Sequence, residues 1–243
     1  MKNKKKLIIK LLMIVFLIGI IVSGANIVLW YIENKNNREI KKELDESITI
    51  VETDEGEEVF QIDFESLKSK NPDTVGYIKV NNTNIDYVVV KTKDNSYYLK
   101  HNFNKENNRS GWIFMDYHNK LDGNDKNIVI YGHNTRDGSM FGTLRKVVKK
   151  EWYENKENHF VSLIINGEEK QYQVFSTYSI DVEDYYIKTE FTDKEFKSFI
   201  KTLLKRSVYN YQTDVNENDH ILTLSTCTGN GTRRMVLHAK ELV

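Results

Sequence analysis

The chain opens with an apolar run that is long enough to cross a membrane. Residues 11–32 are 22 residues without a charged side chain, and about 20 apolar helical residues cross the core of a bilayer. Five lysines precede the run, and Trp30 and Tyr31 lie at its far end, where aromatic rings favour the lipid–water boundary. Residues 1–32 therefore predict an uncleaved single-pass anchor with a cytoplasmic basic tail and an extracytoplasmic body. A signal peptide cleaved near residues 23–25 is the competing interpretation.

A polar, charged stretch at residues 33–59 follows the apolar run. Its weak helical pattern around residues 40–44 and its acidic end indicate a juxtamembrane helix or stalk followed by a linker. Apolar positions four and three residues apart then predict a short helix over residues 60–70, before the single proline. We therefore expect a membrane anchor at 1–32, a stalk and linker next, and a folded domain at 60–243.

From residue 75 onward the pattern changes to short runs rich in Val, Ile and Tyr, which turn-forming residues separate. Asn166 and Gly167 stand between two of these runs and form the strongest hairpin signal in the chain. Eight strands are predicted, at residues 75–80, 85–90, 112–115, 127–131, 161–165, 170–178, 221–226 and 235–239.

Two helical patterns interrupt the strands. An apolar stripe at residues 140–148 follows Gly138, and a capping box at residues 192–195 opens a second stripe that continues to residue 206. Both stripes indicate helix faces that pack on a core. Many short strands with few helices predict a mainly β fold, either a barrel or a sandwich with peripheral helices.

Charge and cysteine content narrow the function. The 35 basic and 35 acidic side chains cancel, which excludes a strongly basic nucleic-acid binder on bulk charge. An apolar content of 40% with 29% charged residues suits a folded domain. Cys227 is the single cysteine, so no disulfide can form within the chain. The histidines are scattered without the clustered spacing of a zinc site, so we expect no metal.

Cys227 ends an apolar run and is followed at once by a Gly-containing loop. It is either a small buried hydrophobe or a nucleophile, and a nucleophile requires a nearby base or cation to form the thiolate. Arg233 and Arg234 begin the next predicted strand, and an antiparallel hairpin would bring one of them back beside the sulfur. Neighbouring strand residues face opposite sides, so only one arginine can point toward the cysteine.

His133 is the histidine best placed to act as a base. It follows the apolar strand 127–131 and Gly132, and catalytic side chains often project from loops at the ends of such strands. Its unperturbed pKa of about 6.5 suits general acid–base chemistry. His238 lies within the last predicted strand, where a packed or solvent-facing structural role is expected.

The run TLSTC at residues 223–227, Arg234 beyond it and YGHN at residues 131–134 resemble the sortases of Gram-positive bacteria. The segments at 75–78, 85–89, 94–99 and 114–116, and the helical stripe after residue 192, look like class B sortases in particular. The resemblance spans residues 60–243. It implies an eight-stranded sortase-type β-barrel with N-terminal helices and a helix between strands six and seven.

The resemblance also implies a cysteine transpeptidase that needs no cofactor. Cys227 would attack the Thr carbonyl of an Asn-Pro-x-Thr sorting motif near the C-terminus of a secreted surface protein. The thioacyl-enzyme would then be resolved by an amine of the cell-wall precursor. His133 would be the general acid and base, and Arg234, which directly precedes the apolar run of the last strand, would stabilise the oxyanion and the substrate. Some class B sortases carry an acidic residue where this chain has Gly229.

A substrate groove is implied on both sides of the cysteine. Its residues are expected to come from three segments of the chain, namely Asn95 and Leu99, Tyr186 and Ile187, and Ser225 and Thr226. Strand alternation places Ser225 on the same face as Cys227.

Two other functions compete with wall anchoring. The same enzyme could link pilin subunits, with a protein lysine in place of the wall amine. The chain could also be an extracytoplasmic binding module in which Cys227, His133 and Arg234 are structural.

Overall fold

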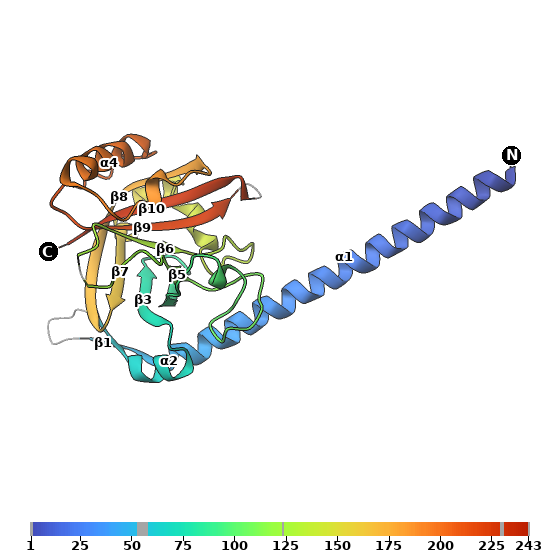
Figure 1. Cartoon of the computed structure of the whole chain (residues 1–243), viewed down its shortest axis with the longest axis horizontal. Coiled ribbons are helices and arrows are strands. Elements are labelled where there is room, and N and C mark those ends of the chain that lie inside the picture. The colour runs from blue at the N-terminus through green and yellow to red at the C-terminus, as the bar shows by residue number, and fades with distance from the viewer. Residues whose placement is uncertain (1, 53–57, 123, 229–230, 243) are drawn as a thin grey trace.

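The computed structural model describes residues 2–52, 58–122, 124–228 and 231–242, with the side chains of residues 2, 3, 50, 52, 58, 59, 227 and 228 outside it. Figure 1 shows a β-barrel from which one long helix projects. The helices are α1 Lys2–Asp45, α2 Phe64–Lys70, α3 Lys150–Glu154 and α4 Asp193–Arg206, with 3₁₀ turns at Tyr97–Leu99, Gly142–Lys146, Lys156–His159 and Tyr185–Ile187. The strands are β1 Ile48–Glu52, β2 Glu58–Ile62, β3 Thr74–Val80, β4 Asp86–Val90, β5 Phe114–Met115, β6 Asn127–Tyr131, β7 Phe160–Ile165, β8 Glu168–Asp181, β9 Ile221–Thr228 and β10 Arg233–Glu241.

Strands β3 to β10 close into a barrel in the order β10-β8-β7-β3-β4-β5-β6-β9. The pairs β4–β5 and β6–β9 are parallel, and the other neighbours are antiparallel. All eight predicted strands are present, so the prediction of an eight-stranded barrel is confirmed. Closure pairs every strand with two neighbours and removes the exposed sheet edges that favour aggregation.

The β7–β8 hairpin forms as the sequence predicts. Asn166 and Gly167 occupy the turn with φ of 53° and 86°. Two consecutive positive φ values are the mark of the type I′ turn, whose twist matches that of the flanking strands.

Helix α4 lies between β8 and β9, the sixth and seventh strands of the barrel, as predicted. Its N-terminus carries a capping box, in which the Thr192 side chain accepts from the Glu195 N–H and the Glu195 carboxylate accepts from the Thr192 N–H. Phe196, Phe199 and Leu203 form its buried face. They pack with apolar residues of β8 and β10 into a second core beside the barrel interior.

Two predicted helices are wrong in part. The apolar stripe at residues 140–148 forms only the 3₁₀ turn Gly142–Lys146, although its apolar residues are buried as predicted. The stretch at residues 60–70 is a helix only from Phe64, since residues up to Ile62 pair with β1 in a two-stranded sheet that the sequence did not predict.

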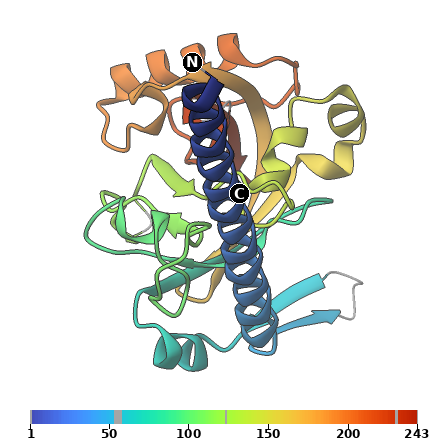
Figure 2. The ribbon, with the colours of Figure 1, turned by 90° about the vertical axis from the view of Figure 1, so that its right-hand side faces the viewer.

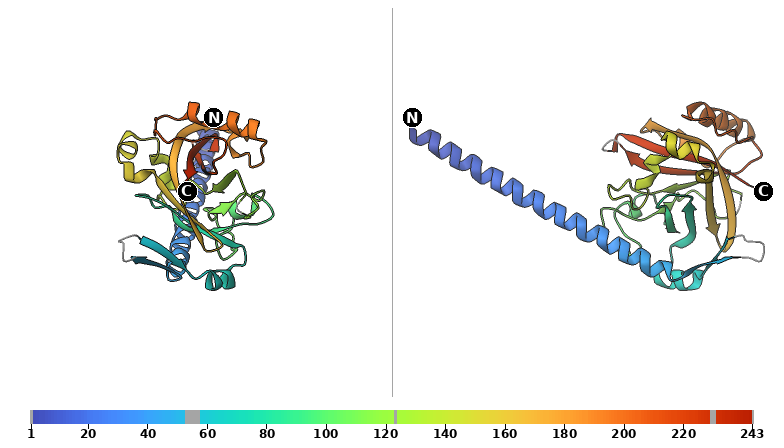
Figure 3. Two further views of the ribbon diagram at one scale, coloured as in Figure 1. Left: turned by 90° about the vertical axis from the view of Figure 1, so that its left-hand side faces the viewer. Right: turned by 180° about the vertical axis from the view of Figure 1, so that it is seen from behind.

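The juxtamembrane helix is the continuation of the apolar helix and docks on the barrel. Helix α1 is unbroken to Asp45, and its last turns bury Asn34, Asn37, Ile40 and Leu44, which lie three or four residues apart on one face. Figure 2 shows α1 crossing in front of the barrel, and Figure 3 shows its C-terminal end beside the barrel while its N-terminal end projects away. Residues 33–45 therefore pack against the barrel as a continuation of this helix.

Candidate active site

Strand register brings the candidate residues to one end of the barrel. Tyr131, the last residue of β6, pairs with Ser225 of the parallel strand β9. The next residue, Gly132, still donates its N–H to the Ser225 carbonyl at 3.3 Å. Cys227 follows on β9 and pairs with Arg234 of β10. The backbone thus places Cys227, Arg234 and the start of the His133 loop beside one another, while the Cys227 side chain and Gly229 lie outside the described residues.

Two glycines allow the close packing around His133 at this end of the barrel. A Cβ on Gly132 would overlap the Ile113 side chain and the Phe141 ring, so only glycine lets the chain turn here. Gly111 has φ of +55°, and a Cβ there would overlap the Tyr98 carbonyl and lie within 3.1 Å of the His133 ring. Gly111 therefore leaves room for the His133 ring, and Gly132 lets Ile113 and Phe141 pack closely just before it.

The His133 ring is oriented by a backbone carbonyl. Its Nε2 lies 2.8 Å from the Leu99 carbonyl oxygen. A carbonyl can only accept, so Nε2 carries a proton, and in the neutral ring the lone pair is on Nδ1. No described residue hydrogen-bonds to Nδ1. The nitrogen available for proton transfer is therefore Nδ1, and the partner that fixes the ring is no carboxylate.

The two arginines of β10 face opposite sides. Arg233 is bound on the outside, where it pairs with Asp181 at 2.7 Å and donates to both the side chain and the carbonyl of Ser179. Arg234 lines a cavity at the barrel end and donates to the Gly231 carbonyl at 3.0 Å. No carboxylate of the described residues forms an ion pair with Arg234, so its charge is available to a ligand.

The cavity beside Arg234 collects the residues expected to bind substrate. Its volume is about 220 Å³, and all six lie on its wall, namely Asn95, Leu99, Tyr186, Ile187, Ser225 and Thr226. The Tyr186 and Ser225 hydroxyls are hydrogen-bonded to each other at 2.9 Å, which links two sides of the cavity. The Thr226 hydroxyl is buried and has no hydrogen-bond partner among the described residues.

A buried carboxylate behind this cavity was missed by sequence reasoning. Asp116 is 2% exposed and accepts hydrogen bonds from the Asn95 amide at 2.8 Å and the Tyr131 hydroxyl at 2.7 Å, and both of these residues line the cavity. Its other oxygen accepts from the His118 N–H. Burial and the adjacent Asp116 charge raise the pKa of Tyr131, so this phenol stays protonated and donates. In the sequence, the only signal for this role of Asp116 is its place directly after a buried strand.

His238 has a structural role in the core. His238 is fully buried, with hydrogen bonds of 2.8 Å to the hydroxyls of Tyr178 and Thr223, as its place in the last strand predicts. Burial, with a smaller effect of Arg206, lowers the pKa of His238 to about 3. Among the described residues no group of three or more His, Cys, Asp or Glu could hold a metal ion.

Known proteins share both the sequence and the barrel. The sequence profile of the sortase domain matches residues 78–242. Sortase B of Staphylococcus aureus is 35% identical over 242 residues, which cover 98% of this chain and 98% of that protein. The chain belongs to the sortase family, as a class B sortase. The crystal structure of Bacillus anthracis sortase B in complex with AAEK1 is 35% identical to this class B sortase, with a TM-score of 0.76 over 87% of this chain and 99% of that one.

A Staphylococcus aureus sortase B–substrate complex also matches this class B sortase. It is 37% identical, with a TM-score of 0.69 over 74% of this chain and 84% of that one. The family membership makes the protein a cysteine transpeptidase of the kind that anchors surface proteins in Gram-positive bacteria. The expected family and fold class are both confirmed.

Proposed function

We propose that this class B sortase cleaves secreted proteins after the Thr of an Asn-Pro-x-Thr type motif and transfers them to an amine of a cell-wall precursor. The observation that carries the proposal is the shared cavity, because Arg234 and all six expected substrate residues line it. Ligand sites are typically clefts with apolar and aromatic walls and a few convergent polar groups, and this cavity has both. A substrate complex of the related Staphylococcus aureus sortase B supports a substrate site in this fold.

Cys227 is the proposed nucleophile. Its thiolate attacks the Thr carbonyl carbon, the scissile C–N bond breaks, and His133 donates the proton that the leaving amine takes. The acceptor amine then attacks the thioester, His133 removes the amine proton, and Cys227 leaves as a thiolate. Neither step requires a metal or an organic cofactor.

Arg234 is the proposed oxyanion and substrate stabiliser. An arginine stays protonated, so it cannot be the base. Its unpaired charge on the cavity wall can stabilise the negative charge that develops on the substrate oxygen. The planar guanidinium can bind that oxygen and a backbone carbonyl together.

We further propose that the chain is a single-pass membrane protein with residues 1–32 as anchor and the barrel outside the cell. One described helix is long and apolar enough to cross a membrane, and its apolar side chains from Leu7 to Ile32 are exposed rather than covered by protein. The lysines before this run place its N-terminus in the cytoplasm. The catalytic domain proper begins near residue 60 and is extended by the docked end of α1.

A panel of peptides tests the motif. The full chain in detergent is expected to cleave Asn-Pro-x-Thr peptides followed by Asn or Gly, and to release an amine adduct when an amine acceptor is added. Cys227→Ala should abolish cleavage, because the chain holds no second sulfhydryl. A preference for Leu-Pro-x-Thr-Gly peptides would refute the motif while leaving the transpeptidase chemistry intact.

A further inference from the structure

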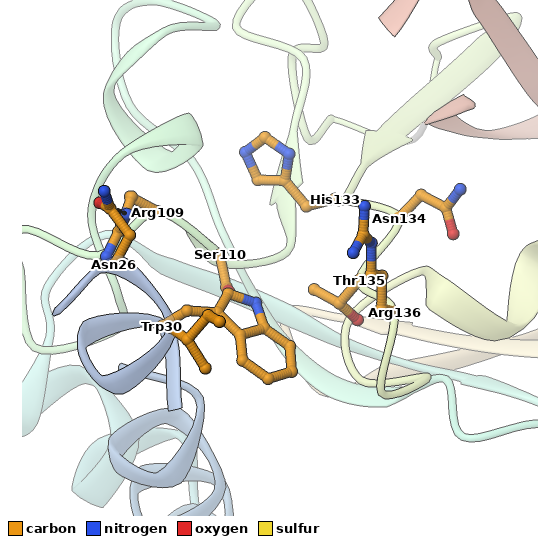
Figure 4. A pocket seen from close by; sticks show the side chains of 9 residues that line it. Asn26, Trp30, Arg109, Ser110, His133, Asn134, Thr135 and Arg136 are labelled. Carbon is orange, nitrogen blue, oxygen red and sulfur yellow. Dashed lines mark hydrogen bonds between the residues drawn. The ribbon is translucent and has the colours of Figure 1, made fainter. Parts of the chain in front are cut away.

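A second cavity separates helix α1 from the loop that carries His133. Its volume is about 510 Å³, and it shares no lining residue with the substrate cavity. Figure 4 shows Asn26 and Trp30 of α1 facing Arg109 and Ser110 on one side and residues 133–136 on the other. His133 lies between the two cavities, since its ring contacts the carbonyl of Leu99, which lines the substrate cavity.

The walls of this α1 cavity carry positive charge. Arg109 and Arg136 line it, and no acidic residue does. Arg109 pairs with Glu33 at 2.9 Å, which compensates its charge, and donates to the Asn26 side chain at 3.4 Å. Arg136 is exposed and has no hydrogen bond or ion pair with the described residues. The neighbouring Asp137 is neutralised by Arg38 at 3.1 Å, so the charge of Arg136 remains uncompensated.

The same cavity opens beside the end of the apolar helix. Ile27 and Trp30 contribute its apolar side and are 65% and 37% exposed. Both lie in the last turns of the run that is long enough to span a bilayer, where tryptophan favours the headgroup region. In a membrane-anchored chain the arginines would stand at headgroup height, beside the apolar Ile27 and Trp30.

We propose that this cavity binds the phosphate of an anionic phospholipid of the outer leaflet, with its glycerol and upper acyl chain against Ile27 and Trp30. A guanidinium pairs with a phosphate through two parallel hydrogen bonds, and basic residues at the membrane surface attract anionic lipids. Binding fixes the His133 edge of the barrel at the bilayer surface. The inference rests on the membrane anchor proposed above.

Lipid enrichment tests the site. The full chain is placed in nanodiscs of phosphatidylcholine with a minor fraction of phosphatidylglycerol, extracted into mild detergent, and its retained lipids are quantified by mass spectrometry. Phosphatidylglycerol should be enriched over its share in the disc. Arg136→Gln should lower the enrichment about fivefold, the effect of losing one basic residue near an anionic surface. Arg136→Lys keeps the charge and should retain part of the phosphatidylglycerol enrichment. Lys201→Gln on α4, away from the cavity, is the control and should retain all of the enrichment.

Three results would overturn the lipid site. The first is equal retention of the two lipids by the wild type, and the second is enrichment that Arg136→Gln leaves unchanged. The third is displacement of phosphatidylglycerol by inorganic phosphate, which would assign the cavity to a soluble phosphate. Arg109→Gln gives a second measurement, with thermal unfolding as its control because Arg109 also holds Glu33.

Peptide cleavage by the same preparations separates this inference from the proposed function. Arg136→Gln should cleave a soluble sorting peptide at the wild-type rate, and loss of cleavage together with lipid enrichment would contradict a separate lipid site. A wild type that enriches phosphatidylglycerol but cleaves no sorting peptide would refute the proposed motif and support the lipid site.

Discussion

At the residue scale, the adjacent arginines of β10 separate a catalytic from a structural role. Arg234→Lys is expected to lower the initial rate on a sorting peptide by about 10²–10³, the usual cost of losing an oxyanion donor. Arg233→Lys should leave the rate close to wild type, because Arg233 binds Asp181 and Ser179 on the outer face. Wild-type activity of Arg234→Lys together with an inactive Arg233→Lys would reverse the assignment.

Asp116 is expected to position the wall of the substrate cavity. Asp116→Asn replaces one accepting oxygen by an NH₂ group, so the side chain can no longer accept from Asn95 and Tyr131 at one oxygen and from the His118 N–H at the other. The free energy of unfolding should fall by about 1.5–3 kcal/mol, as for lost hydrogen bonds to a charged group, and KM for the peptide should rise more than kcat falls. Asp122→Asn, at an exposed position, is the matched control. A changed stability with unchanged KM would leave Asp116 a purely structural residue.

His238 makes stability depend on pH. Its pKa is about 3 in the folded protein and about 6.5 when unfolded. Between these values the unfolded chain binds a proton that the folded protein excludes, so stability falls as the pH is lowered, by at most about 1.4 kcal/mol per pH unit. Urea unfolding between about pH 4 and 7 should show a shallower pH dependence for His238→Gln. Equal slopes for both proteins would exclude His238 as the group responsible.

At the scale of elements, the docked end of α1 is expected to stabilise the barrel. Leu44 is 2% exposed and belongs to the main core. Leu44→Ala should lower the free energy of unfolding by about 2–5 kcal/mol, the usual cost of removing a buried leucine side chain. Lys42→Ala, on the exposed side of the same helix, should change it by less than about 0.5 kcal/mol. If both substitutions lower the free energy of unfolding by similar small amounts in denaturant, the contact of α1 with the barrel does not stabilise the fold.

At the scale of the whole molecule, a chain that begins at residue 33 should be soluble, monodisperse in gel filtration and active on peptides. It omits the exposed apolar part of α1 and keeps the buried face that starts at Asn34. A chain that begins at residue 46 removes that face and should unfold at a lower temperature. Aggregation of the longer form would show that the anchor is no separate module.

Local patterns determined much of this protein. The runs of β-forming residues predicted the eight barrel strands. Asn166-Gly167 predicted a hairpin turn, and both residues have the positive φ values of that turn. The capping box at Thr192 marked the start of α4. These signals depend on the conformational preferences of neighbouring residues, so a sequence alone carries them. Strand alternation predicted that only one of Arg233 and Arg234 faces the cysteine, and the resemblance to class B sortases pointed to Arg234.

Only the tertiary structure decided how distant segments meet. The parallel pairing of β6 with β9 sets Tyr131 opposite Ser225, although 94 residues separate them in the chain. In the sequence, Asn34 and Asn37 suggest a solvent-exposed helix face. In the structure they are buried and hydrogen-bond to Asn108, Ser110 and Gly111. Buried polar groups are stabilised by hydrogen-bond partners that are far away in the sequence. The spacing of apolar residues indicates which positions are buried, but it does not identify those partners. For that reason the docking of α1, the role of Asp116 and the cavity beside Trp30 could be found only in the folded molecule.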